Sequence, residues 1–484
     1  MAPGCGVDAV SDLPSGWHWE CVAEFADGGL FSDGDWVETK DQDPQGEVRL
    51  TQLADVGVGS FRNRSDRRLR RDQAAALGCT YLAPNDILIA RMPDPIGRAC
   101  LVPAVIGEAV TVVDVAVLRI RRPDVVPTYV MWAINSPTFR QHVEALQSGT
   151  TRKRISRRNL ATLRIPVPPL EEQRRIVAIL DDHLSRLDAA DSLLRKSSVR
   201  LRGLGEAIMR SELLGTTHAG ARHPPNLPAV GTNDGVLAHL PPGWRWTRLG
   251  ELADVVGGVT KDAKRQSDLT FVEVPYLRVA NVQRGRLDLS KISTIRVPPA
   301  KAAALRLLPG DVLLNEGGDR DKLGRGWVWD GQIPDCIHQN HVFRARVIDD
   351  SIDPRLLSWA ANLIGGPWCE SNGIQSVNLA SISLKKIRLM PVPVPPVELQ
   401  PAIAAKIADR LAGIEHLHRD LDAALNRSKA LRRSLLEAAF SGRLTGSAVP
   451  DSAAESASTE ASSVNPPSSQ APAPTPNTED ATHD

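Results

Sequence analysis

The sequence predicts an α+β fold: two mixed α/β globules in tandem, each followed by a long helix, with the two helices pairing inside the chain. Three observations carry this prediction. The chain repeats itself at one offset of 227 residues, each repeat holds short β-branched segments, and each repeat ends in a heptad-patterned stretch. With 484 residues, 42% of them hydrophobic, the chain has room for two or three domains with cores of their own.

The repeat covers a whole unit and not a short motif. "LPSGWHWE" (13–20) recurs as "LPPGWRWT" (240–247), and "IPVPPLEEQ" (165–173) recurs as "VPVPPVELQ" (392–400). Between these ends, Gly97-Arg98 falls on Gly324-Arg325. One offset that serves from end to end indicates a tandem duplication. We interpret the paired tryptophans as packing residues, with stacking on nucleic acid as the alternative.

Each globule alternates strand-like and helical segments. "DILIA", "VTVVDVAVLRI", "DVLLN", "GWVWDG" and "HVFRARVI" are rich in β-branched or aromatic residues and are bounded by Gly, Pro or Asp, which is typical of strands. Helical segments such as "TYVMWAINSPTFRQHVEAL" and "PRLLSWAANLI" lie between them. The pattern predicts mixed globules of roughly 150 residues, a usual size for one domain.

The long helices carry the strongest local pattern, because apolar residues recur with spacings of three and four over more than four heptads. His183 and Arg410 interrupt the two series. Each "PVPP" holds the chain extended, the glutamates that follow favour a helix start, and glycine stops each helix. The predicted seam consists of Ile176, Leu180, Leu187, Leu194, Leu201 and Ile208 in the first helix and Ile403, Ile407, Ile414, Leu421, Leu431 and Leu435 in the second.

These patterns divide the chain into seven segments. We expect a disordered N-terminus (1–12), a first globule (13–165), a first long helix (166–214), a flexible linker (215–239), a second globule (240–393), a second long helix (394–445) and a disordered tail (446–484). The first twelve residues lack the features of an export signal, and no window of about 18 apolar residues exists. We therefore expect a cytoplasmic protein with six reduced cysteines and no membrane partner.

A net charge of only +1 hides strong segregation of charge. Residues 1–50 hold eleven acidic side chains, whereas "RNRSDRRLRR" (62–71) packs six arginines into ten positions. "TRKRISRR" (151–158) adds five more basic residues. Such segregation creates a local positive field, although a solvated loop without a partner is the alternative reading of either run.

Catalytic motifs are missing from the sequence. It contains neither a G-x-x-x-x-G-K-[ST] phosphate loop nor a glycine-rich nucleotide fingerprint after a strand. His338 and His341 in "CIHQNH" lie close to Cys336, but we interpret them as structural, with a metal site as the alternative. Carboxylates are spread without an obvious acid–base pair. We expect no resident cofactor or metal and no catalysis by this chain alone.

The ordered set of motifs resembles the specificity subunit of type I restriction–modification enzymes. The resemblance rests on the two tryptophan motifs, on "GTTRKRISRRNLATLRIPVPPLEEQRRIVAILD" (149–181), on "GRGWVWDGQIPDCIHQNHVFRAR" (324–346) and on "LRRSLLEAAFSGRLTG" (431–446). It covers about residues 13–446. Two departures are Pro401, where a basic or polar residue is usual, and the lack of an "HQNH" counterpart in the first globule.

The resemblance implies a non-catalytic subunit that binds double-stranded DNA. Its globules would be target recognition domains, each reading one half of a bipartite, asymmetric site, and its helices would form an antiparallel coiled coil that sets their spacing. Two methyltransferase (modification) subunits would dock on it to methylate adenine with S-adenosylmethionine, and two restriction/translocase subunits would add ATP-dependent translocation and cleavage. The cofactors would belong to those partners.

For DNA contacts we favour basic residues on loops, most of them to phosphates. About 33 residues of seam span roughly 50 Å, enough to place two readers on successive turns of about 34–36 Å. Gln339 and Asn340 could read adenine, but a structural role is the stronger reading. A duplicated coiled-coil scaffold that does not read DNA is the alternative function, and a single-chain nuclease–methylase is disfavoured. The chosen residues are Arg62, Arg64, Arg67, Arg68, Lys153 and Arg154 in the first globule and Arg278, Arg284, Arg286, Arg320 and Lys322 in the second.

Overall fold

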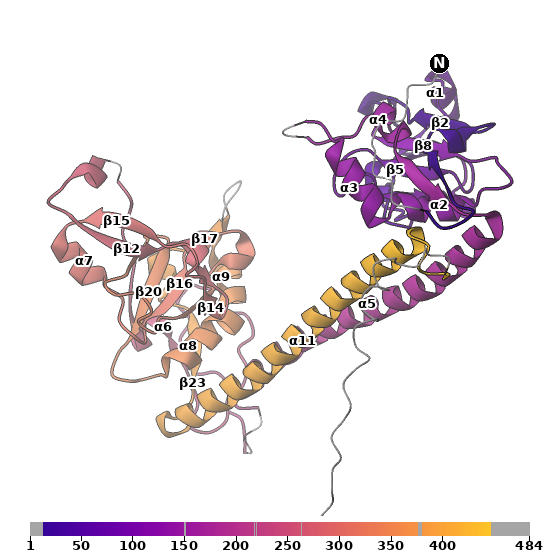
Figure 1. The fold of residues 1–484 in the computed structure, drawn as a ribbon. Coiled ribbons are helices and arrows are strands. Elements are labelled where there is room, and N and C mark those ends of the chain that lie inside the picture. Colours follow the sequence, from indigo (N-terminus) through magenta and orange to yellow (C-terminus); the bar gives the residue numbers. More distant parts are fainter. Residues whose placement is uncertain are drawn as a thin grey trace, which may run out of the picture. The chain divides into compact units, whose positions relative to one another are not determined.

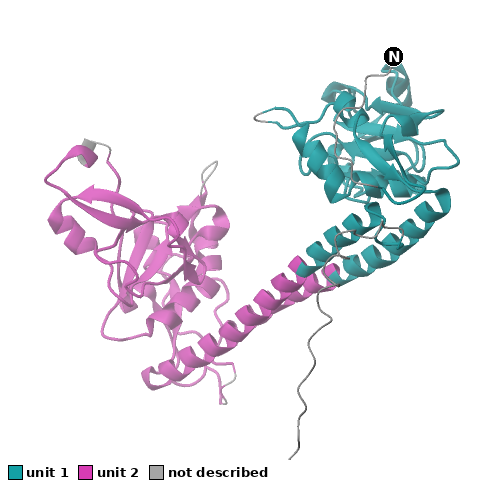
Figure 2. Ribbon diagram, in the orientation of Figure 1, with its two compact units in different colours: residues 1–190, 427–484 teal, residues 191–426 magenta. Residues whose placement is uncertain are grey.

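The computed structural model describes residues 13–149, 152–216, 218, 220–262, 264–375 and 380–446. The chain divides into two compact units, one formed by residues 1–190 and 427–484 and the other by residues 191–426 (Figure 2). Helices α5 (Leu170–Leu213) and α11 (Gln400–Phe440) each contribute to both units (Figure 1). The predicted disordered N-terminus (1–12) and all of the predicted disordered tail (446–484) except residue 446 lie outside the described residues.

Unit 1 is built on an antiparallel sheet with the order β2-β8-β5-β6. Ile87 and Ile89 on the central strand β5 pack into one apolar cluster, and Leu88 and Ala90 pack into another. Successive side chains of a strand point to opposite faces, so a continuous apolar run such as "ILIA" fits a strand covered on both sides. The bounds are β2 (Leu30–Asp33), β5 (Ile87–Ala90), β6 (Ala99–Leu101) and β8 (Val115–Arg119).

Two smaller sheets complete unit 1. In one, β3 pairs with β4 antiparallel and with β7 parallel, and in the other β1 pairs with β9, the strand that leads into α5. The strands are β1 (His18–Cys21), β3 (Val48–Thr51), β4 (Arg68–Leu69), β7 (Ala109–Thr111) and β9 (Arg164–Val167). The helices are α1 (Arg71–Ala76), α2 (Pro127–Ile134), α3 (Pro137–Ala145) and α4 (Arg157–Ala161).

Unit 2 repeats this arrangement strand for strand. Its antiparallel sheet has the order β11-β20-β16-β18, β12 pairs with β15 antiparallel and with β19 parallel, and β10 pairs with β23. The strands are β10 (Arg245–Arg248), β11 (Ala253–Val256), β12 (Val272–Leu277), β15 (Ser293–Val297), β16 (Val312–Asn315), β18 (Gly326–Val328), β19 (Ile337–His338), β20 (Val342–Val347) and β23 (Pro391–Val394).

Unit 2 also contains further short strands and several helices. The two-residue strands are β13 (Val282–Gln283), β14 (Arg286–Leu287), β17 (Gly317–Gly318), β21 (Ile374–Gln375) and β22 (Ala380–Ser381). The helices are α6 (Leu249–Leu252), α7 (Pro299–Leu305), α8 (Pro354–Ala360), α9 (Gly366–Asn372) and α10 (Leu384–Ile387), with a π-helical turn at Ala361–Gly365 between α8 and α9.

The glutamine of the "P-x-P-P-x-x-x-Q" motif ties each long helix to its globule. Gln173 is 1% exposed; its Oε1 accepts from Val126 N at 2.9 Å, and its Nε2 donates to the carbonyls of Asp124 and Pro168 at 3.1 and 3.0 Å. Pairing all of its polar atoms makes burial of an amide tolerable. The same bonds occur 227 residues later, between Gln400 and Asp353, Ser351 and Pro395.

A buried ion pair also recurs in both sheets. Asp86 is 1% exposed and accepts from Nε and Nη2 of Arg119 at 2.8 and 2.7 Å. Asp311, likewise 1% exposed, accepts from the same two atoms of Arg346 at 2.7 and 2.8 Å. Bidentate geometry fixes both partners, so each pair locks the turn before its central strand to the neighbouring strand.

In each unit the two long helices run in opposite directions. In unit 1, Glu172 accepts from Thr445 at 2.6 Å and Asp188 accepts from Arg432 at 2.8 Å. Residue numbers therefore increase along one segment while they decrease along the other. In unit 2, Ser198 contacts His418 at 3.4 Å and Glu212 contacts Lys406 at 2.8 Å. Of the predicted seam residues, Ile176, Leu180, Ile403 and Ile407 are buried, and Leu187, Leu194, Leu201, Ile208, Ile414, Leu421 and Leu435 are half-buried.

The prediction that Leu431 lies in the seam is wrong, because its side chain is 60% exposed. Ser428 is buried and Arg432 is half-buried in its place. An α-helix repeats every 3.6 residues, so a face extrapolated at strict heptad spacing drifts around the helix. Four residues separate Ser428 from Arg432, and this step restores the face.

The paired tryptophans are packing residues, as predicted. Trp17, Trp244 and Trp246 are each 8% exposed or less, and Trp19 is half-buried. The predicted helix "TYVMWAINSPTFRQHVEAL" is split in two, since the Ser136 hydroxyl caps α3 by accepting from Phe139 N at 3.3 Å and Pro137 starts the new helix.

Candidate nucleic-acid interface

The arginine-rich loop of unit 1 (residues 62–68) is held by one buried carboxylate. Asp55, at the end of a 3₁₀ turn (Leu53–Asp55), is fully buried. Its Oδ1 accepts from the backbone N–H groups of Arg64 and Ser65 at 2.6 and 2.8 Å, and its Oδ2 accepts from Gln52 N at 2.8 Å. A carboxylate with several backbone donors is a rigid anchor. The loop therefore presents its arginines from a fixed backbone.

The six arginines of "RNRSDRRLRR" fall into two groups. Arg70 and Arg71 form ion pairs with Asp72 and Glu108 at 3.2 and 2.8 Å, which neutralises them locally. The other four are exposed and have no ion pair within the described residues. Of these, Arg67 donates to Gln42 Oε1 at 2.9 Å and Arg68 to the carbonyls of Gly46 and Glu47 at 3.3 and 3.4 Å, whereas Arg62 and Arg64 have free guanidinium groups in the part of the chain described.

A second basic loop of unit 1 carries Lys153 and Arg154. The backbone of Arg154 bridges Ser148 by two hydrogen bonds of 2.8 Å, which closes the loop. Both basic side chains are exposed, and no carboxylate of the described chain lies within ion-pair distance of either. Like Arg62 and Arg64, they carry a positive charge that is not paired with a carboxylate of the described chain. Such a charge is available for contact with a phosphate.

The basic residues predicted for unit 2 are mostly engaged. Arg284 donates to the carbonyls of Asn362 and Asp321 at 2.6 and 3.2 Å, and Lys322 forms an ion pair with Asp319. Arg320 donates to the carbonyl of Glu370 at 3.3 Å, and Arg278 is half-buried. Arg286 is exposed on β14, and neither its side chain nor that of Arg278 makes a hydrogen bond or ion pair within the described residues.

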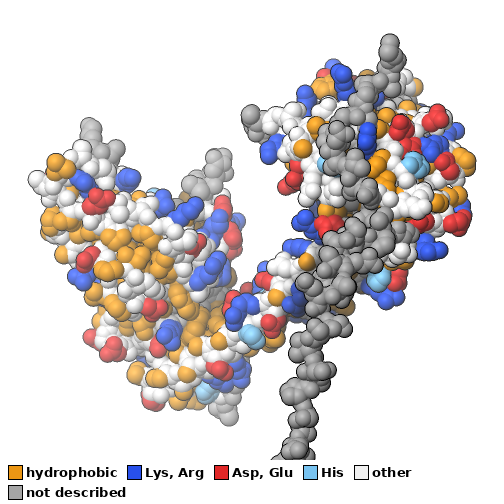
Figure 3. Space-filling view, viewed as in Figure 1, with side chains coloured by type: hydrophobic (Ala, Val, Ile, Leu, Met, Phe, Trp, Pro, Cys, Tyr) orange, Lys and Arg blue, Asp and Glu red, His pale blue; other side chains and the backbone are white. Residues whose placement is uncertain are grey.

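On the face drawn in Figure 3, Lys and Arg side chains of each unit are interspersed with Asp and Glu and form no continuous basic patch. On this face, counting charges along the sequence overstates the basic surface. Contacts to DNA would have to come from a few unpaired cations at fixed places.

One aromatic residue of this interface was not predicted from the sequence. Trp36, after β2, is 71% exposed and lines a recess of about 790 Å³ in unit 1, next to Arg67. A tryptophan is usually a core residue, so nothing in the sequence marked this one out. Its neighbours in the sequence "DGDWVE" are mostly acidic, and acidic residues do not indicate a contact with DNA.

The "CIHQNH" segment is structural around its first histidine. His338 is fully buried, and its Nδ1 donates to the carbonyl of Val342 at 2.6 Å, while Nε2 is buried without a partner among the described residues. His341 is exposed and contacts Glu316 at 2.7 Å. Gln339 and Asn340 are half-buried. Among the described residues no group of three His, Cys, Asp or Glu side chains is placed to hold a metal ion.

The buried imidazole predicts a pH dependence of stability. Burial lowers the pKa of His338 from 6.5 to about 4, because protonation would place an unpaired N–H⁺ in the core. The unfolded chain therefore binds the proton first, and the free energy of unfolding should fall by about 3 kcal/mol as the pH drops from 6.5 to 4. His338→Gln should remove that part of the slope in urea unfolding at several pH values. An unchanged slope would show that another group titrates.

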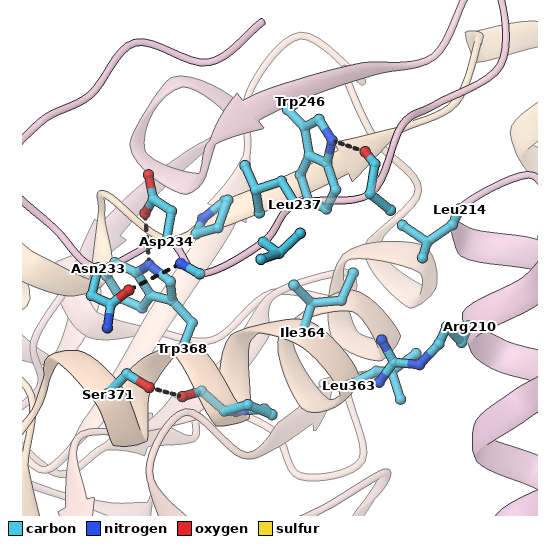
Figure 4. Close-up of a pocket in the computed structure, with 15 residues that line it drawn as sticks. Arg210, Leu214, Asn233, Asp234, Leu237, Trp246, Leu363, Ile364, Trp368 and Ser371 are labelled. Atoms are coloured by element: carbon cyan, nitrogen blue, oxygen red, sulfur yellow. Dashed lines mark hydrogen bonds between the residues drawn. The ribbon is translucent and has the colours of Figure 1, made fainter. Parts of the chain in front are cut away.

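Part of the segment predicted as a flexible linker (215–239) makes hydrogen bonds to the second globule. Asp234 accepts from Trp368 Nε1 at 2.9 Å (Figure 4) and from Nη2 of Arg248 at 2.8 Å. Asn233 exchanges hydrogen bonds of 2.9 and 2.8 Å with Asn372. The contacts border a recess of about 260 Å³. The Pro and Gly content predicted flexibility, but hydrogen bonds to buried partners fix this part of the segment.

No helix of the described chain is both long enough and apolar enough to span a bilayer.

Comparison with known proteins points to one system. Residues 79–192 match the family described as "Type I restriction modification DNA specificity domain". The chain is 25% identical over 323 residues to the type I restriction enzyme StySPI specificity subunit of Salmonella potsdam, a match that covers 66% of each chain. It is 21% identical over 316 residues to the EcoKI specificity subunit of Escherichia coli strain K12, covering 64% of each chain. The match thus spans about two thirds of these relatives.

A solved structure shares the fold. A chain from a study of complex assembly and conformational transition in the type I restriction–modification system superposes with a TM-score of 0.66 at 22% identity, covering 90% of this chain and all of that one. At that identity the likeness establishes the fold alone. The sequence matches and the fold agree, and they confirm that the chain is similar to the specificity subunits of type I restriction–modification enzymes.

Proposed function

We propose that this chain is the DNA sequence-specificity subunit of a type I restriction–modification complex. Each globule reads one half of a bipartite, asymmetric DNA site, and the chain itself catalyses nothing. Two methyltransferase subunits dock on the paired helices, and two restriction/translocase subunits complete the complex. The globules correspond to residues 13–165 and 240–393, and the helices to 166–214 and 394–445.

The observation that carries this proposal is a shared scaffold with unlike surfaces. The two units have the same strand order and the same buried glutamine and ion-pair bonds. Yet the six arginines of 62–71 correspond at the same offset to residues 289–298, where Lys291 and Arg296 are the basic residues. Conserving the framework while changing the exposed side chains is what two readers of different half-sites require. A scaffold that does not read DNA is not favoured, because the family match over 79–192 is to a DNA specificity domain.

The paired helices supply the spacing in this proposal. Their segments run in opposite directions in each unit, as an antiparallel coiled coil formed within one chain requires. Each helix joins its globule through the buried glutamine, which ties the start of the helix to a segment of that globule. A helix pair fixed at both ends would make the gap between half-sites as strict as the bases themselves.

Binding at several salt concentrations tests the DNA-reading role. Arg62→Ala and Arg64→Ala should each weaken binding of the assembled methyltransferase complex by a similar factor on every sequence. Each change should also reduce the slope of log K against log salt by about one, because one phosphate contact is lost.

Arg70→Ala is the matched control, because Arg70 already has Asp72 as its partner. This variant should keep the wild-type slope. A wild-type complex with a shallow slope and no preference among sequences would contradict the proposal and favour the scaffold.

A further inference from the structure

The recess beside the arginine-rich loop has the make-up of a surface that contacts bases. It has a volume of about 790 Å³, and its lining includes Trp36, Gln42, Gln52, Leu53, Arg67 and Arg98. Gln52 and Leu53 adjoin Asp55, the carboxylate that anchors the loop carrying Arg62 and Arg64. One turn therefore forms the wall of the recess on one side and supports the unpaired arginines on the other.

Trp36 is far more exposed than the other tryptophans of the chain, although the backbone around it is fixed. It is 71% exposed, whereas the other nine tryptophans are buried or half-buried. Its backbone is fixed, since Gly34 N and Asp35 N donate to the carbonyls of Val115 and Thr111 at 2.8 Å each, and its indole N–H donates to Glu38 Oε1 at 3.3 Å. A large flat apolar ring held still in water is a feature of binding surfaces.

The lining of the recess includes a buried arginine, Arg98, with a full set of polar partners. Arg98 is 3% exposed, and its guanidinium donates to four backbone carbonyls, among them those of Val56 and Leu53 at 2.7 Å each. These bonds hold together the segments that line the recess. Arg98 forms no ion pair within the described residues, so its positive charge is not cancelled by a local carboxylate.

Other polar groups of the lining suit base edges better than phosphates. Gln42 and Arg67 are joined by a 2.9 Å hydrogen bond, and they present an amide and a guanidinium, the groups that read adenine and guanine. Asp35, Glu38 and Asp114 also line the recess. Carboxylates repel phosphate, but they accept hydrogen bonds from the amino group of cytosine.

Unit 2 has the same backbone arrangement at this place, but a different side chain follows it. Gly34 and Gly258 each lie so close to the neighbouring strand that a Cβ would be 2.3 Å from the carbonyl oxygen of Val112 or 2.0 Å from that of His338. The next residue bridges that strand in both units. The residue after the bridge is Trp36 in unit 1 and Thr260, also exposed, in unit 2.

We infer that Trp36, with Gln42 and Arg67 beside it, is the base-reading surface of the first globule, where the indole packs against a base and the two polar side chains contact base edges. This inference rests on the proposed function. It assigns reading to the recess and phosphate binding to Arg62 and Arg64. It also predicts that changes at Trp36 affect one half-site only.

The test uses the full-length subunit assembled with its methyltransferase partners. The modified sequence is first mapped with the wild-type complex, and binding is then measured on duplexes that carry that sequence or single-base changes in either half. Trp36→Ala should reduce discrimination roughly tenfold at positions in one half-site and leave the other half-site and the spacer unchanged. Trp36→Phe should retain part of the discrimination. Val105→Ala, which trims a side chain 92% exposed in the same unit, is the control and should change nothing.

Three outcomes would overturn the inference. Trp36→Ala could bind as the wild type does, it could lose affinity equally for all duplexes, or it could lose discrimination in both halves. An equal loss would place the indole on the backbone of the DNA. A wild-type complex without any sequence preference would instead refute the proposed function, so the two failures are distinguishable. Because Trp36 is exposed, thermal unfolding of the variants should match the wild type and exclude misfolding as the cause.

Discussion

Lengthening both long helices should lengthen the DNA spacer and leave both half-sites unchanged. Four residues inserted after Ala190 and four after Asn426 add close to one helical turn to each helix, or about 6 Å. These positions correspond in an antiparallel pair, as the contacts of Asp188 with Arg432 and of Ser198 with His418 indicate. The spacer of the methylated sequence should grow by roughly two base pairs, since base pairs are about 3.4 Å apart along each strand.

A seven-residue insertion at the same positions is the sharper variant. It adds about 10 Å and keeps the heptad phase, so the buried faces remain aligned and the spacer should grow by roughly three base pairs. An insertion in α5 alone is the control and should impair pairing of the helices and assembly. Should the double insertions methylate the wild-type sequence with its original spacer, the helices do not set the distance.

Removing Asp311 should destabilise unit 2 by about 2–3 kcal/mol, because Arg346, whose side chain is 36% exposed, would keep only its bond to the carbonyl of Arg306. Asp311 also accepts from Leu308 N at 2.7 Å, so the turn before β16 would lose its anchor as well. Urea unfolding of Asp311→Ala should show this loss, and Asp311→Asn, which keeps the shape, should lose less.

Glu273→Ala is the matched control for this ion pair. Glu273 is half-exposed and pairs with Arg296 at 3.4 Å on the surface of the same unit, so its loss should cost much less than the loss of Asp311. Asp86→Ala should reproduce the Asp311→Ala effect in unit 1, because the ion pair there is the same. Equal stabilities of Asp311→Ala and Glu273→Ala would show that the buried pair contributes no more than a surface one.

Local patterns in the sequence predicted the elements that local forces determine. The heptads of α5 and α11 and the alternating strands were recognisable because each depends on residues a few positions apart. Gln173 and Gln400 were visible as part of a repeated motif. Their function was not, since their partners near Asp124 and Ser351 lie 49 residues earlier in the chain.

The candidate site was harder to predict, because charge along the chain does not reveal which partners fold against it. Arg284 and Lys322 look as free in the sequence as Arg62 does, but they bind a carbonyl and a carboxylate of their own unit. Trp36 was missed for the converse reason, since only the fold shows that a residue type usually buried is exposed here.

Mapping of modified adenines across the genome tests the central claim most directly. Cells with this gene and cells without it are compared under the same conditions. We expect one bipartite, asymmetric sequence with a fixed spacer to be methylated in the first and unmethylated in the second. Identical methylation in both, or loss of a palindromic sequence, would contradict the claim that two unlike globules read the two halves of one site.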